Sequence, residues 1–436
     1  MTVTDPVAIG QAVARMLDEQ RFSDVADRFA PPLRALVSAT ALQQAWDAEL
    51  ARTGPISAVG EPVIEPGGPW AGRVSVAVTG ERGGFTVVMS LDDAGLLSGL
   101  QFTAGAWEAP PYAHPDAFEE QEITLGSGSP AVPGTLSLPR GRGPWPGVVL
   151  LSGGGPFDRD ATSGPNKPLK DLAWGLAGRG VAVVRFDKVT YAHAAQVAEL
   201  KEFTMAEEYV PHAVAAARLL QSLPGVDATR VFVAGHSMGG KVAPRVAAAE
   251  PSVAGLVIMA GDTEPIHRAA VRVAGHLASM SGDPQMAELL ETVTRQAALA
   301  DSPDLSPATP AADLPFGLWP GSYWLDLRGY DPVATAASLD RPMLILQGGR
   351  DYQVTVQDDL TRWKAGLGHR PDVTIRVYDA DDHLFFPGTG PSTPADYARA
   401  QHVDPQVVAD VAEWLLKWDR TAGQRVGQDA GRERPH

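Results

Sequence analysis

Cysteine is absent from the 436 residues of this chain. Disulfide bonds, thiolate metal sites and cysteine nucleophiles are therefore excluded. Ser, His, Asp, Glu, Lys and Tyr remain as catalytic side chains. The histidines show no metal-ligand spacing such as H-E-x-x-H. We therefore expect a reaction that needs no metal and no other cofactor.

Long apolar runs and an excess of basic residues are also lacking. No run is long enough to span a bilayer, and the segment Met1–Pro6 has neither the basic nor the apolar region of a secretion signal. The net charge is −16. Nucleic acids and anionic membranes are bound mainly through basic patches. We therefore expect a cytoplasmic protein that binds neither nucleic acid nor a membrane.

The length of the chain predicts two or three domains. Residues 7–53 carry helical periodicity, and four short alternating segments follow between Ile56 and Phe102. These patterns predict a small α+β domain over residues 1–103, with a Pro-rich linker at 104–117. We expect this domain to serve packing, to cover a site or to form the contact of a homodimer. A polar tail is predicted at 421–436.

Beyond Trp145 the pattern becomes an alternation of short apolar strands and helices, which is typical of an α/β fold with a mostly parallel sheet covered on both faces. We assign residues 118–420 to this domain. The predicted strands are Val148–Leu151, Val181–Phe186, Val231–Ala234, Leu256–Met259, Met343–Leu346 and Val373–Tyr378. The connection at about 262–339 is too long for a crossover, and its helical stretches predict a lid.

One serine stands at a forced turn between a strand and a helix. The predicted strand Val231–Ala234 is followed by Gly235-His-Ser237-Met-Gly239, and a predicted helix begins at Lys241. A G-x-S-x-G turn of this kind raises the serine hydroxyl above the sheet, and the glycines allow close approach of the backbone. A serine that merely caps the helix is the alternative interpretation of this motif alone.

A histidine and a carboxylate follow two later strands. Asp351 comes directly after the strand Met343–Leu346, and His383 lies in the loop after Val373–Tyr378. A serine hydroxyl needs a base to take its proton, and the base needs an orienting carboxylate. The order Ser237, Asp351, His383 is the order found in α/β-hydrolases, so we predict that the three form a catalytic triad.

Neighbouring residues offer alternatives to this triad. Asp381 and Asp382 flank His383 and could orient it instead of Asp351. We expect both to be solvated loop acids. His236, beside the serine, would point away from the hydroxyl at such a turn, and we expect it to be a packed residue.

A glycine-rich loop, Gly153–Gly155, follows the strand Val148–Leu151. Backbone amides of such a loop can stabilise an oxyanion, and we predict that the amides of Gly154 and Met238 do so, with Gly153 as the alternative to Gly154. The loop has no G-x-G-x-x-G and no P-loop lysine, which argues against phosphate binding.

Aromatic side chains gather in the predicted lid. We predict that Trp319, Tyr323 and Trp324 line the substrate pocket. The alternative is that they form the core of the lid itself.

Together these residues resemble bacterial α/β-hydrolases of the dienelactone-hydrolase-like branch. The strings that carry the resemblance are Gly153-Gly-Gly-Pro-Phe-Asp-Arg-Asp160, Gly164-Pro-Asn-Lys-Pro-Leu-Lys-Asp171, Leu346-Gln-Gly-Gly-Arg-Asp351 and Gly390-Pro-Ser-Thr-Pro-Ala-Asp-Tyr397. The resemblance that these strings carry extends over most of residues 118–418. Relatives commonly have His where this chain has Ser152, which puts the support of the glycine loop in doubt.

The resemblance implies a serine esterase, often with a small domain of unknown function ahead of the catalytic domain. We therefore predict cleavage of a small-molecule ester or related acyl compound through an acyl-enzyme. The same triad could instead catalyse acyl transfer, lactone formation or peptide cleavage. A binding protein that keeps the fold without the chemistry is the remaining alternative.

Overall fold

The computed structural model describes residues 5–418 except 65–71, 82, 105–106, 127–129, 201 and 282–283. The polar tail predicted at 421–436 lies outside the described residues, as do residues 105 and 106 of the predicted linker. The chain divides into two compact units. The first contains Met1–Glu108, Ser163–Asn166 and Pro394–Gln401, and the second contains Ala109–Thr162, Lys167–Thr393 and His402–His436.

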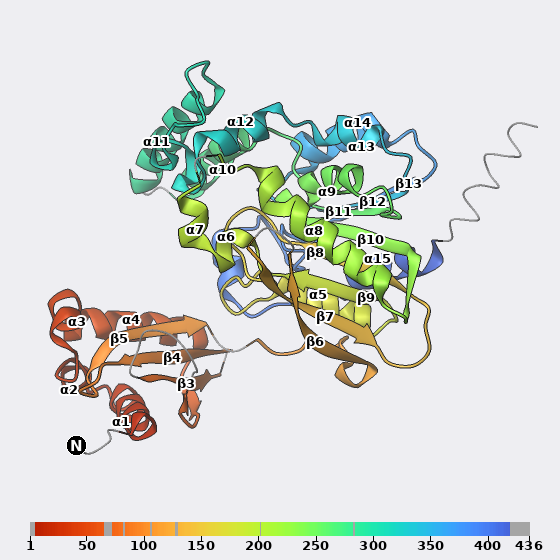
Figure 1. Ribbon diagram of the computed structural model, residues 1–436. Coiled ribbons are helices and arrows are strands. Elements are labelled where there is room, and N and C mark those ends of the chain that lie inside the picture. Colours follow the sequence, from red (N-terminus) through yellow and green to blue (C-terminus); the bar gives the residue numbers. More distant parts are fainter. Residues whose placement is uncertain are drawn as a thin grey trace, which may run out of the picture. The chain divides into compact units, whose positions relative to one another are not determined.

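The first unit has four helices and an antiparallel sheet (Figure 1). Its elements are α1 (Pro6–Asp18), α2 (Phe22–Ala26), α3 (Pro31–Leu36), α4 (Ala39–Thr53), β1 (Ile56–Val59), β2 (Val63–Ile64), β3 (Gly72–Gly80), β4 (Gly83–Leu91) and β5 (Leu97–Ala104). The first of the four alternating segments, Ile56 to Ile64, forms two strands rather than one, both paired with β3. Pro62 lies in the break, and proline has no N–H for a ladder bond.

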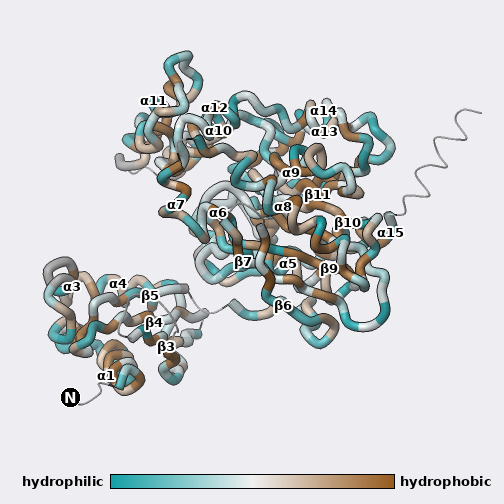
Figure 2. Tube along the Cα trace, in the orientation of Figure 1, coloured by the Kyte–Doolittle hydropathy of each residue, from teal (hydrophilic) through white to brown (hydrophobic). Residues whose placement is uncertain are grey.

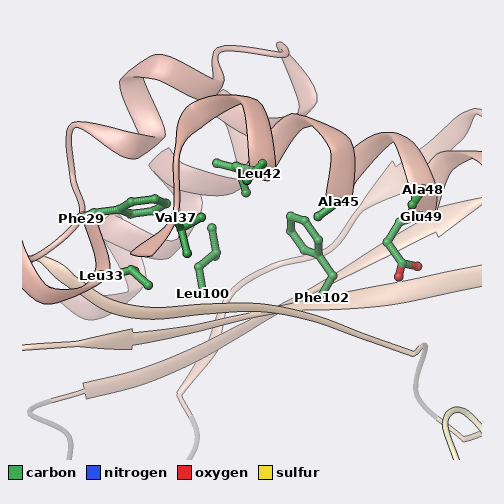
Figure 3. Close-up of a pocket in the computed structure, with 10 residues that line it drawn as sticks. Phe29, Leu33, Val37, Leu42, Ala45, Ala48, Glu49, Leu100 and Phe102 are labelled. Atoms are coloured by element: carbon green, nitrogen blue, oxygen red, sulfur yellow. The ribbon is translucent and has the colours of Figure 1, made fainter. Parts of the chain in front are cut away.

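Apolar side chains between the helices and the sheet form the core of the first unit. Trp46 of α4 contacts Phe85 and Phe102 edge to face, at ring-centroid distances of 5.3 and 5.5 Å. A cavity of about 370 Å³ lies between α4 and β5, lined by apolar side chains and Glu49 (Figure 3). Its lining contains no hydroxyl, amine or imidazole, so this cavity offers neither the serine nor the histidine of the predicted triad.

The second unit is built on an eight-stranded sheet in the order β13-β12-β11-β10-β8-β9-β7-β6. The strands are β6 (Phe118–Leu125), β7 (Val132–Pro139), β8 (Trp145–Leu151), β9 (Ala182–Phe186), β10 (Val226–His236), β11 (Leu256–Met259), β12 (Met343–Gly348) and β13 (Val373–Tyr378). All pairs from β13 to β9 are parallel, and β7 joins antiparallel to β9 and β6. The predicted fold class is confirmed: the sheet is mostly parallel and is preceded by an antiparallel hairpin.

Helices cover both faces of this sheet (Figure 1). Val231 and Val233 of β10 belong to the core shared with α8 (Met205–Ser222) and α9 (Met238–Ala249). Phe232, which points to the opposite face, contacts Trp414 of α15 (Pro405–Lys417) at 5.5 Å. Helix α5 (Pro168–Ala177) packs beside α15. Figure 2 shows the hydrophobic stretches concentrated in these central strands.

The long connection between β11 and β12 is mainly helical. It contains α10 (Ile266–Ser281), α11 (Pro284–Asp301), the short turns η2 (Ala311–Asp313) and η3 (Pro315–Gly317), α12 (Gly321–Gly329) and α13 (Pro332–Ala337). Ala270 and Ala274 of α10 pack against Val293 of α11. Over the described part of the chain, no helix combines the length and the apolar character that a membrane span requires.

The remaining short elements lie in loops around the sheet. They are η1 (Pro115–Ala117), α6 (Val189–Ala192), α7 (Ala194–Ala198), η4 (Val356–Leu360) and α14 (Thr361–Leu367). The short turn η5 (Pro394–Ala398) belongs to the first unit. The carboxyl ends of β8, β10, β11, β12 and β13 meet at one edge of the sheet because these strands are parallel. In such sheets ligands bind outside that edge.

Candidate active site

Ser237 is held at the turn between β10 and α9. Its backbone has φ 55° and ψ −123°, a conformation that costs a non-glycine residue about 1–3 kcal/mol. The turn closes only because both flanking residues are glycines. A Cβ on Gly235 would lie 2.1 Å from the carbonyl oxygen of Gly239, and one on Gly239 would lie 2.5 Å from the carbonyl oxygen of Leu151. The predicted elbow is therefore present.

Asp351 and His383 contact each other at the same sheet edge. His383 Nδ1 donates to Asp351 Oδ2 at 2.7 Å, and both side chains are buried. The other carboxylate oxygen of Asp351 accepts from the backbone amides of Gln353 (2.8 Å) and Val354 (2.9 Å). Because Nδ1 carries the donated proton, the Nε2 lone pair of His383 remains available as a base.

The protonation of His383 depends on this pair. Burial alone would lower the pKa of His383, but the charge of Asp351 and the hydrogen bond to it outweigh burial and raise that pKa above its ordinary value. The Ser237 hydroxyl has no hydrogen-bond partner among the described residues. In structures without substrate, hydrogen bonds between nucleophile and base are often loose and tighten in the complex.

His236 supports the loop of His383. Its Nε2 donates to the backbone carbonyl of His383 at 2.7 Å, and the two rings lie 4.7 Å apart. Burial, together with the neighbouring His383, lowers the pKa of His236 to about 3. A packed imidazole is what the sequence predicts at this position, but the sequence does not indicate its neutral state or its contact with His383.

The two aspartates beside His383 point elsewhere. Asp382 Oδ1 accepts from the amides of Leu384 (2.9 Å) and Phe386 (3.1 Å) and so closes the local turn. Burial, with the neighbouring Asp404, raises the pKa of Asp381 to about 7. Both side chains are buried, so the expectation that they are solvated is wrong.

The glycine loop after β8 lies against the elbow. A Cβ on Gly153 would lie 3.2 Å from Ser237 Cβ, and one on Gly154 would lie 3.0 Å from Met238 Cε. Met238 is the first residue of α9, and N–H groups in the first turn of a helix have no intrahelical partner. The amides of Gly154 and Met238 therefore come from backbone segments that meet beside Ser237.

A buried polar network holds this loop. Tyr209 donates its hydroxyl proton to the carbonyl of Gly153 at 2.6 Å and lies 3.1 Å from that of Ser152. Lys188 Nζ donates to the same Gly153 carbonyl (2.9 Å) and to the Tyr209 oxygen (2.7 Å), and pairs with Glu208 at 3.0 Å. In a trans peptide the carbonyl and the next N–H point in opposite directions. Holding the Gly153 carbonyl therefore turns the Gly154 N–H away from the network.

This network answers the doubt raised by Ser152, whose own hydroxyl is buried without a hydrogen-bond partner. The sequence indicates only that Asp187 and Lys188 could tie down the glycine loop by ion pairs. It gives no role to Glu208 or Tyr209 and no hydrogen-bonding role to Tyr323. Tyr323 donates to Glu208 Oε2 at 2.5 Å. The sequence carries one usable signal, the position of Lys188 two residues after the end of a buried strand.

The sequence also favours ion pairs of Asp158, Arg159 and Asp160 that would hold the glycine loop. These pairs are present in part. Arg159 pairs with Asp187 at 2.9 Å, and Asp160 pairs with Arg185 at 2.8 Å. Asp158 instead accepts from residues of its own turn.

A cavity of about 670 Å³ opens at Ser237. Gly154, Met238 and Trp319 line it together with residues of α10 and α11. Tyr323 and Trp324 are fully buried and are not among its lining residues. Trp319 stacks on Tyr323 at 4.8 Å, so the structure divides the predicted aromatic set into one pocket residue and two residues of the core behind it.

The described residues contain no group of three or more His, Asp or Glu side chains able to hold a metal ion. The groups that meet at this edge are a raised hydroxyl, an imidazole oriented by a carboxylate, and backbone amides beside the hydroxyl. Such a set can add a serine to a carbonyl carbon and stabilise the resulting oxyanion.

Comparison with known proteins adds independent findings. The chain is 35% identical over 341 residues to esterase EstD of Thermotoga maritima, covering 77% of this chain and 78% of that protein. Over 146 residues it is 25% identical to esterase FrsA of Klebsiella pneumoniae, covering 34% of this chain and 32% of that protein. The solved structure of Est1E from Butyrivibrio proteoclasticus superposes with a TM-score of 0.44 at 16% identity, over 68% of this chain and 98% of that chain. No protein-family model matches the sequence.

Proposed function

This chain belongs to the α/β-hydrolase esterase family that includes esterase EstD, and we propose that it is a serine hydrolase of carboxylic esters. The observation that carries the proposal is the 2.7 Å hydrogen bond from His383 to Asp351, formed at the sheet edge where Ser237 is raised on its turn. An imidazole oriented in this way is the base that a serine hydroxyl needs.

The proposed reaction begins with attack by Ser237. Its oxygen bonds to the ester carbonyl carbon while Nε2 of His383 takes the hydroxyl proton, and Asp351 stabilises the imidazolium. The carbonyl oxygen becomes an oxyanion, which accepts hydrogen bonds from the amides of Gly154 and Met238. The intermediate collapses when the bond to the leaving alcohol breaks and His383 returns its proton to that alcohol.

The second half of the reaction repeats these steps with water. His383 takes a proton from water, the hydroxide oxygen bonds to the acyl carbon, and Ser237 leaves with the proton that His383 returns. The products are the acid and free enzyme. The roles of Asp351 and of the two amides are the same in both halves.

Gly154 is preferred to Gly153 as the donor for two reasons. It lines the cavity at Ser237, whereas Gly153 does not, and its peptide is held through the Gly153 carbonyl by Lys188 and Tyr209. A donor that is already oriented needs no reorganisation when charge develops.

The test is the Ser237→Ala variant, assayed on a short-chain p-nitrophenyl ester. We expect a fall in kcat of about 10⁴-fold or more, and covalent labelling of the parent at Ser237 by a fluorophosphonate. Full hydrolysis by the variant, or labelling at another residue, would contradict the proposal.

A further inference from the structure

The cavity at Ser237 continues as a groove along helix α10. The residues of α10 that line it recur at helical spacing, namely Ile266, Ala269, Ala270, Val273, Ala274 and Leu277. Residues at this spacing form one continuous face of a helix. The lining therefore follows α10 from Ile266 to Leu277, eleven steps along the helix, which is about 16 Å at a rise of about 1.5 Å per residue.

One end of this groove is the proposed reaction centre. Helix α10 begins four residues after Asp262, which follows β11, and β11 pairs with the strand that ends at His236. Ser237, Gly154 and Met238 line this end. The groove therefore starts at the nucleophile and the proposed oxyanion donors and runs away from them along the lid.

The walls of the groove are mostly apolar. Leu289 and Val293 of α11, which packs beside α10, also line it, as do Phe316, Leu318 and Trp319. The charged lining residue, Asp262, is paired through Oδ2 with Lys241 Nζ at 2.8 Å, while its Oδ1 is buried without a hydrogen-bond partner. Gln296 donates to the Ala312 carbonyl at 3.2 Å. A hydrocarbon chain would meet few polar groups that need a partner.

Large apolar side chains at the mouth of the groove are unusually open to solvent. Phe316 is 53% exposed, Leu318 50% and Leu289 45%. Phe316 also has φ 68°, which is a strained conformation for an aromatic residue. Apolar surface that gathers on one opening is typical of a binding groove.

We propose that this groove binds the acyl chain of the ester, and that the preferred substrates carry linear acyl chains of medium length, about eight to twelve carbons. The proposal rests on the esterase function above. An extended chain advances roughly 1.25 Å per methylene, so about twelve carbons span the groove. Shorter acyl groups would leave most of its apolar surface in water.

The acyl group rather than the alcohol occupies the groove because of where His383 lies. The leaving alcohol must face His383, which returns the proton to it. His383 is a described residue and does not line the groove, whereas both proposed oxyanion donors do. The alcohol therefore leaves on the His383 side, and the acyl chain extends along α10.

The test is a series of p-nitrophenyl esters from acetate to tetradecanoate, kept below their micelle concentrations. We expect kcat/KM to rise about two- to fourfold per added methylene where the chain is buried, to exceed the butyrate value by about tenfold or more at decanoate, and to level near dodecanoate. A profile that falls beyond butyrate overturns the groove but leaves the esterase function standing. If no ester is cleaved and the fluorophosphonate does not label Ser237, both the proposed groove and the proposed esterase function are wrong.

A substitution in α10 tests where the acyl chain of the substrate lies. Val273 lies seven residues beyond Ile266, so Val273→Trp should close the groove about 10 Å along α10. We expect the ratio of dodecanoate to butyrate kcat/KM to fall at least tenfold. The matched control is Ser279→Trp, on the same helix but exposed and outside the lining, which should keep the parental ratio. An equal loss on both substrates contradicts the proposal.

A measurement on the unmodified protein tests the proposal without depending on whether the variant folds. Dodecanoate should inhibit butyrate-ester hydrolysis at a concentration at least tenfold lower than butyrate does. Equal inhibition by the two acids would overturn the proposal whether or not the Val273 variant folds.

Discussion

Tyr209 places its hydroxyl 2.6 Å from the carbonyl oxygen of Gly153, from inside a core that has no solvent access. This contact links helix α8 to the loop that carries a proposed oxyanion donor. Burial raises the pKa of Tyr209 well above its ordinary value, so the hydroxyl keeps its proton and donates it. The orientation of the Gly154 amide thus depends on a residue that is not itself among those lining the cavity.

Removing this hydroxyl should weaken catalysis without weakening binding. In Tyr209→Phe the peptide that presents the Gly154 amide loses one of the two hydrogen bonds that the Gly153 carbonyl accepts from Tyr209 and Lys188. We expect kcat to fall about tenfold with KM nearly unchanged. Steady-state kinetics on one ester measure both constants. The matched control is Tyr378→Phe, whose hydroxyl donates to Asp410 at 2.7 Å and should leave kcat within about twofold of the parent. A change confined to KM would refute the positioning role.

Asp351 should matter through the orientation of His383. An amide at this position presents either an acceptor or a donor to Nδ1 and no longer stabilises the imidazolium, so Asp351→Asn should lower kcat by about 10⁴-fold. The control lies in the same loop as His383. Asp382→Asn keeps an oxygen for the amides of Leu384 and Phe386, and we expect activity within about threefold of the parent. Equal losses in the two variants would contradict the assignment of Asp351.

The acid limb of the pH profile should report His383. The base must be neutral, and its pKa is raised by Asp351. We therefore expect kcat/KM to rise with pH through a single group whose apparent pKa lies above about 6.5, the ordinary value for histidine. The measurement is kcat/KM on a non-ionising ester from pH 5 to 9. An acid limb with an apparent pKa below about 6 would show that a group other than His383 is being titrated.

Asp381 should make stability depend on pH independently of catalysis. Its folded-state pKa is about 7, above the ordinary value of 3.8 for an aspartate, so the folded protein binds an extra proton between these values and loses stability as pH rises through that window. Asp381→Asn removes the buried charge. We expect the Tm of this variant to exceed that of the parent by about 1–3 °C at pH 8, and to differ little at pH 5. The same gain at both pH values would rule out titration of Asp381 as the cause.

The parts of the molecule that could be predicted from the sequence are those fixed by neighbours along the chain. Apolar runs between helical stretches give the parallel sheet, and Ser237, Asp351 and His383 each lie just after a strand of that sheet, as the sequence indicates. The carboxyl ends of parallel strands necessarily meet. Knowledge of which residues follow which strand was therefore enough to bring these three to one edge.

The support of the site could not be predicted in this way. Lys188 and Tyr209 lie 21 residues apart, and Tyr323 joins Glu208 across 115 residues. No local pattern pairs such residues, because the pairing depends on how α12 and α8 pack. The groove is a different case. The apolar face of α10 is readable at helical spacing, but the sequence does not say whether such a face covers a core or a ligand.

At Ser237 the residue that supplies the hydroxyl is also one that the local backbone conformation destabilises. Glycine adopts the backbone conformation of this turn without the strain that serine has there. A glycine, which has no hydroxyl, would therefore make the folded protein more stable. A search for thermostable forms of this chain would therefore tend to reward inactive molecules at this position. Selection for heat resistance would have to be coupled to turnover to keep the hydroxyl.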